Sequence, residues 1–449
     1  MEQRRIVVVG GDAAGMRAAS VAKRRGGDDV DVVVFERGAH TSYALCGLPY
    51  FVGGLVHGAD RLVARTPEQH RENGIDVRMG HDVRAVALGA HEVEVVGPHG
   101  DVTRERYDRL VLATGAAPVR PPLPGIDAPG VSSIHSIPDA VALDALLRDR
   151  QPRRAVVVGG GYIGLEMVEA FLLRGLEVTL VEKLTQPMAT LDPEMAERVA
   201  DALVALGVDT RLGVGVEGFE TGADGWITGV ATEQGIVPAD VVVLGLGVRP
   251  RAELARDAGI EIGPTGAIAT DDHQRTSAPD VFAAGDCAQT TNRVSGKPAW
   301  VALGTHANQQ GRVVGENVVG GDATFPGVLG TAVTKVCDTE IARTGLNRRE
   351  AADAGFDVAA AITEGRTRAG YYPGVSKMAV KVVAEAASGR MLGAQIVGGK
   401  GAAKRVDAFA VAIWNGMTVE EFAQLDLGYA PPFSTPIDVS LLAARGARL

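Results

Sequence analysis

The chain has 449 residues, 46% hydrophobic and 22% charged, which is typical of a soluble globular protein of about three domains. Its 55 acidic residues outnumber the 45 basic ones, and the formal charge of −10 argues against a general binder of nucleic acids or membrane surfaces. No stretch approaches the roughly 20 consecutive apolar residues of a membrane helix, and no signal peptide is recognisable, so we expect a cytoplasmic protein.

The first 36 residues predict a strand, a glycine turn, a helix and a second strand. RRIVVVG (4–10) is an apolar strand, residues 11–26 read as a turn and an Ala-rich helix, and DVDVVVFE (29–36) is the next strand. Such a unit binds a dinucleotide: amides at the helix start hold the pyrophosphate, and a carboxylate at the strand end, here Glu36, accepts from ribose hydroxyls. The expected G-x-G-x-x-G pattern reads Gly10, Asp12 and Gly15, so its middle glycine is replaced.

A second copy of this unit spans residues 155–182, AVVVGGGYIGLEMVEAFLLRGLEVTLVE. Gly159, Gly161 and Gly164 complete the glycine pattern, and Glu182 closes the second strand. Two copies predict two dinucleotide ligands; the alternative is a tandem repeat with one degenerate copy. Glu182 favours NADH over NADPH because a carboxylate binds the free 2′-hydroxyl and repels a 2′-phosphate, although Lys183 would soften that repulsion.

The three cysteines, Cys46, Cys287 and Cys337, are too dispersed for a zinc site, and we predict no bound metal. Cys337, in the apolar stretch TAVTKVCDTEIA (331–342), is expected to be a buried strand residue, and Cys287 a small core filler beside Asp286. Cys46 stands alone in SYALCGLPY (42–50). The sequence that follows it predicts a helix with Pro49 in its first turn, whose amides would favour the thiolate.

Four further segments match a known family. They are YDRLVLATGAAP (107–118), GYIGLE (161–166), VVVLGLGVRP (241–250) and TSAPDVFAAGDCA (276–288). Together with the glycine turns, residues 1 to about 320 resemble the FAD-dependent pyridine nucleotide-disulfide oxidoreductases. The resemblance implies FAD in the first site, with Asp286 on its ribityl chain, and NAD(P)H in the second, with Tyr162 gating access to the flavin and Glu166 near the nicotinamide.

This resemblance assigns cofactor contacts residue by residue. They fall on Gly10, Asp12, Ala13, Gly15, Glu36, Arg37, Ser42, Ala113, Thr114, Gly115, Gly159, Gly161, Tyr162, Ile163, Gly164, Glu166, Glu182, Lys183, Gly247, Gly285 and Asp286.

Cys46 distinguishes branches within the family. The residue five positions on is Phe51, so the chain lacks the C-x-x-x-x-C pair of glutathione and lipoamide reductases. SYALCGLPYFVGG is most similar to the coenzyme A-disulfide reductases, which use a mixed disulfide. NADH oxidases and peroxidases use a sulfenic acid and carry a histidine where this chain has Ala13. Leu45 departs from the asparagine common before the cysteine of coenzyme A-disulfide reductases; Arg24 and Ser42 are the candidate substrate contacts.

The segment after about residue 322 resembles the family's dimerisation domain. It combines short strand-like runs with one amphipathic helix, in which Ala402, Val406, Phe409 and Ile413 recur at helical spacing. GYYPG (370–374) and GYAPPFS (428–434) are similar to coenzyme A-disulfide reductase motifs. The resemblance implies a homodimer in which Tyr371 and Tyr429 reach the partner's active site and join Cys46 as catalytic residues.

We therefore predict an α/β fold: two Rossmann-like nucleotide-binding domains, for FAD (1–117 and 246–322) and NAD(P)H (118–245), plus a C-terminal α+β dimerisation domain (323–449). The predicted activity is reduction of a small-thiol disulfide, coenzyme A disulfide or a related disulfide or persulfide, by NAD(P)H through a Cys46 mixed disulfide, with NADH preferred and without nucleic-acid or membrane partners. Two alternatives stay open: an NADH oxidase or peroxidase that uses a Cys46 sulfenic acid, and a flavin electron carrier to a protein partner.

Overall fold

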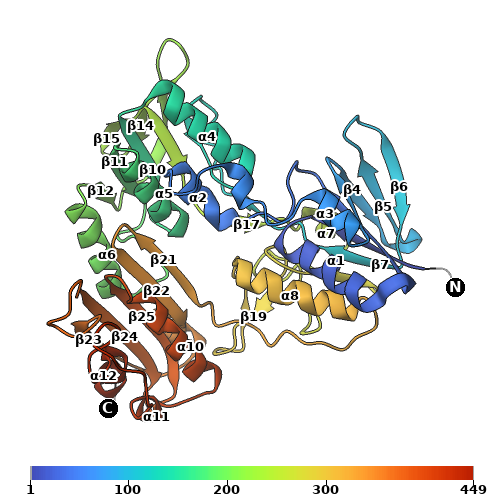
Figure 1. The fold of residues 1–449 in the computed structure, drawn as a ribbon. Coiled ribbons are helices and arrows are strands. Elements are labelled where there is room, and N and C mark those ends of the chain that lie inside the picture. Colours follow the sequence, from blue (N-terminus) through green and yellow to red (C-terminus); the bar gives the residue numbers. More distant parts are fainter. Residues whose placement is uncertain (1–2, 448–449) are drawn as a thin grey trace. The chain divides into compact units, whose positions relative to one another are not determined.

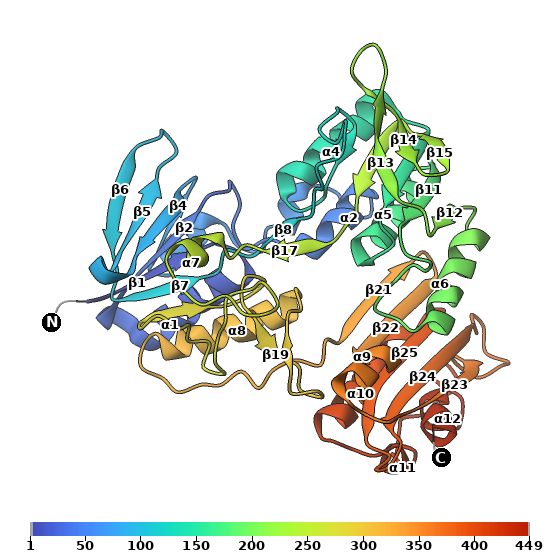
Figure 2. The ribbon, with the colours of Figure 1, turned by 180° about the vertical axis from the view of Figure 1, so that it is seen from behind.

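The computed structural model describes residues 3–447. The chain divides into two compact units, each of which is described by itself. The first contains Met1–Leu48, His57–Pro118 and Val248–Val328, and the second contains Pro49–Val56, Val119–Gly247 and Leu329–Leu449. Figure 1 labels the elements, and Figure 2 shows them from behind. Among residues 3–447, no helix combines the length and apolar character needed to cross a membrane.

A five-stranded parallel sheet forms the centre of the first unit, in the order β18-β7-β1-β2-β3. Its strands are β1 (Arg4–Val9), β2 (Val30–Glu36), β3 (Ile75–Met79), β7 (Arg109–Leu112) and β18 (Val281–Ala283). Ile6, Val7 and Val8 in β1 are fully buried because the sheet is covered on both faces. The predicted first nucleotide fold is therefore present.

Helices α1 (Ala13–Gly26) and α8 (Gly304–Asn317) cover one face of this sheet and lie side by side (Figure 1). Their backbones approach closely: a Cβ on Gly311 would lie 2.4 Å from the Ala14 carbonyl oxygen, and one on Gly315 would lie 2.5 Å from that of Ala18. Only glycine fits this packing, which holds the start of α1 against the central sheet.

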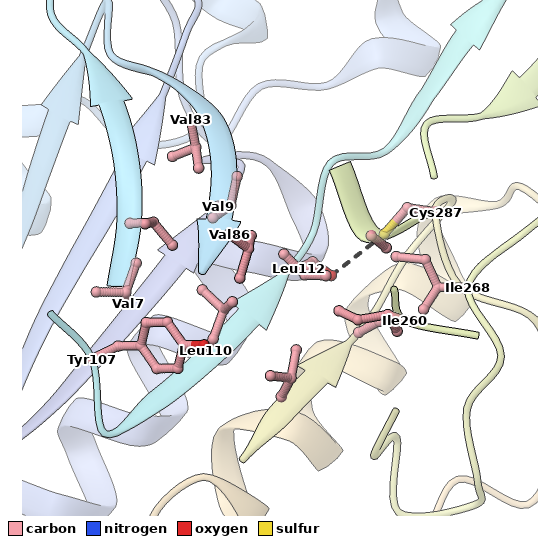
Figure 3. Close-up of a cluster of buried hydrophobic side chains, with 14 of the residues drawn as sticks. Val7, Val9, Val83, Val86, Tyr107, Leu110, Leu112, Ile260, Ile268 and Cys287 are labelled. Carbon is pink, nitrogen blue, oxygen red and sulfur yellow. Dashed lines mark hydrogen bonds between the residues drawn. The ribbon is translucent and has the colours of Figure 1, made fainter. Parts of the chain in front are cut away.

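A three-stranded antiparallel sheet covers the opposite face of the central sheet. Its strands are β4 (Asp82–Ala87), β5 (Glu92–Val96) and β6 (Val102–Arg106). Val83 and Val86 pack in one cluster with Val7 and Leu110 (Figure 3). Cys287 lies in the same cluster, fully buried, and its thiol donates to the Leu112 carbonyl oxygen over 3.4 Å. It is thus the small core residue that the sequence predicted.

Shorter elements complete the first unit. They are α3 (Pro67–Glu72), α7 (Glu253–Asp257), β8 (Ala116–Pro118), β17 (Val248–Pro250), β19 (Thr290–Thr291) and β20 (Pro298–Ala299).

The second unit begins with the same plan. A parallel sheet in the order β12-β11-β10-β16-β9 packs against a three-stranded antiparallel sheet, β13-β14-β15 (Figure 2). The parallel strands are β9 (Val131–Ser132), β10 (Arg154–Val158), β11 (Glu177–Glu182), β12 (Asp209–Leu212) and β16 (Val241–Leu244). The antiparallel strands are β13 (Val216–Thr221), β14 (Ile227–Thr232) and β15 (Gly235–Pro238), and the helices are α4 (Ile137–Arg150), α5 (Tyr162–Leu173) and α6 (Pro193–Ala205).

An antiparallel sheet in the order β21-β22-β25-β24-β23 forms the rest of the second unit. Its strands are β21 (Ala332–Val336), β22 (Thr339–Gly345), β23 (Val358–Arg366), β24 (Lys377–Glu385) and β25 (Met391–Gly398), and its helices are α9 (Arg348–Ala354), α10 (Val406–Trp414), α11 (Val419–Phe422) and α12 (Val439–Gly446). Val406, Phe409 and Ile413 are buried in α10, as the predicted apolar stripe requires. Ala402 is also buried, but it lies before the 3-10 turn Ala403–Arg405 that precedes α10, so the regular helix is shorter than predicted.

A buried ion pair ties the C-terminal sheet to the nucleotide fold of this unit. The Lys381 ammonium lies 2.7 Å from the Asp192 carboxylate, and the two side chains are 2% and 4% exposed. Gln395 donates to the same carboxylate over 2.8 Å and accepts from the Asp192 backbone amide. Each buried charge thus has an oppositely charged partner and further hydrogen bonds, which offset the cost of removing it from water.

The prediction that Cys337 is a buried strand residue is wrong. It lies half-buried in the two-residue turn Cys337–Asp338 between β21 and β22, with a φ of +51°. Its backbone amide donates to Glu169 of α5 over 2.8 Å. The apolar alternation continues on both sides of the turn and no glycine or Asn-Gly pair marks it, so the sequence pattern hides it.

Candidate active site

The first glycine turn connects β1 to α1. Gly10 has a φ of +106°, and a Cβ on Gly15 would lie 1.9 Å from the Gly10 carbonyl oxygen, so the turn requires both glycines. The Glu36 carboxylate, at the end of β2, accepts from the Gly11 amide over 2.7 Å and from the Gly38 amide over 2.6 Å. These amides hold the carboxylate at the edge of the turn, where a ribose is expected.

The second glycine turn, between β10 and α5, repeats this geometry. Gly159 has a φ of +104°, and a Cβ on Gly164 would lie 1.9 Å from the Gly159 carbonyl oxygen. Glu182, at the end of β11, accepts from the amides of Gly160 and Leu184, each over 2.7 Å. Both turns thus have the backbone and the carboxylate of a dinucleotide site.

The two turns differ at the middle position of the motif. A Cβ on Gly161 would meet no atom within 4 Å, so the second turn leaves open space where a pyrophosphate would lie. The first turn has Asp12 instead, and its carboxylate accepts from the Tyr43 amide over 3.1 Å. The pKa of Asp12 is raised to about 6, mainly by burial; the charges of Glu36 and Asp286 add to this effect, and hydrogen bonds from the Tyr43 and Ala13 amides oppose it. Three carboxyl groups therefore lie close together in the first site.

Asp286 is held from two sides. The Trp300 indole donates to its carbonyl oxygen over 2.8 Å, and the buried Gln310 side chain accepts from the Gly285 amide over 2.8 Å. Burial raises the pKa of Asp286 to about 6. Trp300 and Gln310 were not predicted, because nothing in their spacing distinguishes them from core residues.

Ala113, Thr114 and Gly115 follow β7 directly, at the carboxyl end of the central sheet where nucleotides bind in such folds. The Thr114 hydroxyl donates to the Arg251 carbonyl oxygen over 2.6 Å. Arg251 was not among the predicted site residues. Burial and the charge of the nearby Arg37 lower its pKa, and the charge of Glu36 opposes this decrease. With the first glycine turn, these residues form a set that fits the ADP part of FAD.

Cys46 is exposed on a loop that is attached to the first glycine turn. The Thr41 hydroxyl and the Ser42 amide both donate to the Gly11 carbonyl oxygen, the latter over 3.2 Å. Cys46 itself lies in a 3-10 turn, Leu45–Gly47, immediately before α2 (Leu48–Val52). The predicted helix start is confirmed, with Pro49 as its second residue, but the helix has only five residues.

Ser42 is an unusual point in this loop. Its φ is +50°, a region that non-glycine residues rarely occupy, and its hydroxyl lies 2.9 Å from Nε2 of His70. His70 is buried on α3, and burial and the charge of Arg65 lower its pKa, which favours a neutral imidazole. No sequence pattern indicates this contact, since His70 lies 28 residues away on a short capped helix.

The second unit contains the predicted nicotinamide-side residues at the start of α5. The pKa of Glu166 is raised to about 6, mainly by burial and further by the charge of Glu169. A hydrogen bond from the Thr334 hydroxyl over 3.2 Å opposes this increase. Burial also raises the pKa of Tyr162, and Ile163 follows it in the same helical turn. Lys183 and Gly247 are exposed at the ends of β11 and β16.

Tyr371 and Tyr429 lie together, although 58 residues separate them. Both are exposed, at 78% and 48%. Partial desolvation raises the pKa of Tyr429, followed by the charge of Tyr371 and a hydrogen bond to it. Tyr371 and Tyr429 thus form a pair of neighbouring, exposed phenols, each of which can donate a hydrogen bond.

The remaining predicted contacts are surface residues. Arg24 lies exposed in the last turn of α1, and Arg37 is exposed after β2. Ala13 is the first residue of α1. Among residues 3–447, no group of three or more His, Cys, Asp or Glu side chains is placed to hold a metal ion.

The structure thus groups the candidate residues in two sets. Cys46, Arg24 and the residues assigned to FAD lie in the first unit. Tyr162, Glu166, Glu182, Tyr371 and Tyr429 lie in the second.

Comparison with known proteins gives the family. Residues 4–311 match the family model described as pyridine nucleotide-disulphide oxidoreductase, and residues 331–439 match the dimerisation domain of the same family. The NAD(P)H sulfur oxidoreductase (CoA-dependent) of Pyrococcus furiosus is 38% identical over 99% of both chains. A protein of Enterococcus faecalis named NADH oxidase is 33% identical, also over 99% of both chains.

A solved structure described as a NAD-dependent persulfide reductase from A. fulgidus is 40% identical, with a TM-score of 0.95 over 98% of this chain and 82% of that one. The predicted fold class, two nucleotide folds followed by a dimerisation domain, is confirmed. The family that matches residues 4–311 implies FAD and NAD(P)H as cofactors. The chain belongs to the pyridine nucleotide-disulphide oxidoreductase family.

Proposed function

We propose that this chain is a homodimeric flavoprotein that reduces a small-thiol disulfide, coenzyme A disulfide or a related disulfide or persulfide, with NADH. The observation that carries the proposal is Cys46: an exposed thiol whose motif has Phe51 in place of the second cysteine of the C-x-x-x-x-C reductases, on a loop attached to the first glycine turn through the Gly11 carbonyl oxygen and the Asp12 carboxylate. The names of the Pyrococcus furiosus and A. fulgidus relatives support sulfur chemistry.

The proposed reaction is balanced by two electrons. The Cys46 thiolate attacks R–S–S–R, so that one S–S bond breaks, a Cys46–S–S–R bond forms and RS⁻ leaves. Bound FAD supplies the coupling between hydride donation by NADH and electron transfer to sulfur. Two electrons then cleave the mixed disulfide, return Cys46 to the thiolate and release the second RS⁻. In sum, NADH, one proton and R–S–S–R give NAD⁺ and two R–SH.

Protonation of the leaving thiolate is assigned to the tyrosine pair. The Tyr429 phenol, with a raised pKa, keeps its proton at neutral pH and can donate it. We propose that Tyr371 and Tyr429 serve the Cys46 of the partner subunit, because they lie in the part of the chain that matches a dimerisation domain.

Complementation tests this arrangement. Mixing inactive Cys46→Ser protein with a Tyr371→Phe/Tyr429→Phe double variant produces heterodimers in which one of the two sites has an intact cysteine and intact tyrosines. Disulfide reductase activity should then exceed that of either parent. If subunits exchange and activity does not rise, the tyrosines do not act across the dimer.

NADH is the preferred donor in this proposal. The Glu182 carboxylate is oriented by the Gly160 and Leu184 amides, and its charge opposes a 2′-phosphate. We place the enzyme in the cytoplasm, where small thiols are kept reduced. A panel of disulfides, polysulfide, oxygen and peroxide with NADH and NADPH tests the substrate class; turnover of oxygen or peroxide alone would overturn it.

The second candidate is an NADH oxidase, the name of the Enterococcus faecalis relative. It requires Cys46 to cycle through a sulfenic acid and an acid/base group beside it. Ala13 cannot supply such a group. The disulfide reductase is therefore the better-supported function.

A further inference from the structure

Arg405 joins the two loops that contain the candidate tyrosines. It lies at the start of α10 with its side chain only 13% exposed. One guanidinium nitrogen, Nη2, donates to the Thr367 carbonyl oxygen and to the Phe433 carbonyl oxygen, each over 2.8 Å. Thr367 begins the first tyrosine loop (367–376), which contains Tyr371, and Phe433 lies in the second tyrosine loop (428–438), which contains Tyr429.

Asp438 completes the contact at the end of the second tyrosine loop. Its Oδ2 accepts from Arg405 Nε over 2.9 Å and from the Ser434 hydroxyl over 2.7 Å, and its Oδ1 accepts from the Ser440 amide over 2.9 Å. Burial acts to raise the pKa of Asp438, but the hydrogen bonds from Ser434 and Ser440 and the charge of Arg405 lower it overall. The Asp438 carboxylate is therefore ionised at neutral pH and forms an ion pair with Arg405.

The two loops also meet directly, where the Ala369 amide donates to the Pro431 carbonyl oxygen over 3.1 Å. The first loop is closed at its base by a hydrogen bond from the Thr367 amide to the Ser376 carbonyl oxygen over 3.0 Å. Tyr371 and Tyr429 themselves are exposed, so little packing of their own rings holds them in place. Their relative position depends on the loop backbones, and Arg405 contacts both backbones.

We propose that Arg405 is a positioning residue for the tyrosine pair. It holds the first and second tyrosine loops in one register so that the Tyr371 and Tyr429 hydroxyls meet the same substrate sulfur. A guanidinium suits this task because it is planar, always charged and donates in several directions at once. The inference rests on the proposed role of the two tyrosines in disulfide reduction.

The experiment compares Arg405→Gln and Arg405→Lys with a control, Ile413→Ala, in the FAD-loaded dimer. Ile413 is a buried residue of α10, and its truncation leaves a cavity that destabilises this helix. The Ile413→Ala control therefore destabilises this helix but leaves the contacts of Arg405 with the two loops in place. Hydrogen exchange reports on the two loops, and stopped-flow absorbance separates flavin reduction by NADH from reoxidation of the reduced enzyme by disulfide.

We expect Arg405→Gln to speed amide exchange at residues 367–376 and 428–438 and to slow reoxidation by disulfide about 10- to 100-fold, as for a misplaced catalytic group. Flavin reduction by NADH should stay within about twofold of the wild type, since it requires neither tyrosine. Arg405→Lys, which donates without the planar fork, should recover part of both losses. Adding Arg405→Gln to the Tyr371→Phe/Tyr429→Phe variant should cause little further loss.

Two results would overturn the inference: loop exchange and disulfide reactivity unchanged in Arg405→Gln, or the same loss of disulfide reactivity in Ile413→Ala. A failure of the proposed function is visible separately. If the Tyr371→Phe/Tyr429→Phe variant reoxidises at the wild-type rate, the tyrosines have no part in the reaction, whatever Arg405 does to the loops.

Discussion

The two glycine turns have nearly the same backbone but differ in the segments that they contact. In both, a glycine with a φ near +105° starts the turn, and a strand-end glutamate accepts from two amides. The first turn is connected through Asp12 and Gly11 to the loop of Cys46, whereas the second has open space at Gly161. The same fold thus contacts the loop of the candidate thiol in one copy and leaves space for a ligand at the middle glycine of the other.

The largest expected effect on cofactor binding comes from placing a side chain at the last glycine of either glycine turn. Gly15→Val and Gly164→Val each place a side chain where a Cβ would already lie 1.9 Å from a carbonyl oxygen. Gly15→Val should yield protein without FAD, while Gly164→Val should keep FAD and lose NADH binding, with kcat/KM reduced by about 100-fold or more. Bound flavin absorbance and NADH titration check this. Loss of FAD from Gly164→Val alone would show that the two turns have been assigned in the wrong order.

Glu182→Gln should change the nicotinamide preference by an amount worth roughly 1–3 kcal/mol, or about 5- to 150-fold in the ratio of kcat/KM values. The physical reason is loss of the carboxylate that opposes a 2′-phosphate. Glu36→Gln, the matching change in the first turn, should weaken FAD retention and leave the NADH to NADPH ratio unchanged. An unchanged ratio in Glu182→Gln would assign the preference to Lys183 or another residue.

Asp12→Asn should tighten FAD binding at alkaline pH. Burial raises the pKa of Asp12 to about 6, so the folded protein favours the neutral carboxyl group. The stability that this preference contributes is lost as the pH rises through 6, where Asp12 becomes charged. The amide keeps an oxygen for the Tyr43 amide but has no charge next to the pyrophosphate. We expect Kd for FAD, measured by flavin fluorescence, to fall about 10-fold at pH 8 and to change little at pH 5. Equal effects at both pH values would contradict this electrostatic reason.

Glu166→Gln has the smallest expected effect. Burial raises the pKa of Glu166 to about 6, so the side chain is ionised above this pH and can stabilise the positive charge that develops on the nicotinamide. The wild-type rate of flavin reduction by NADH should therefore rise a few-fold as the pH increases from 5 to 7. In Glu166→Gln this rise should be absent while Tyr371→Phe retains it.

The sequence predicted what motif spacing and periodicity encode and missed contacts between residues that belong to no motif or periodic pattern. Both glycine turns, the α10 stripe and the buried Cys287 follow from periodicity and motif spacing over fewer than about 30 residues. The Cys337 turn was missed because its apolar alternation is uninterrupted. His70, Trp300 and Arg405 act through partners 14 to 38 residues away, and their own residue types carry no signal of those partners.

The central claim is that Cys46, next to the first turn, forms a mixed disulfide that NADH reduces. Intact-protein and peptide mass spectrometry test it most directly, on enzyme treated with coenzyme A disulfide and then with NADH under anaerobic conditions. We predict one coenzyme A adduct on the peptide containing Cys46, removed by NADH with release of one thiol per subunit, and no adduct in Cys46→Ser. A gain of one oxygen at Cys46 in place of the adduct, or an adduct that NADH leaves intact, would contradict the account.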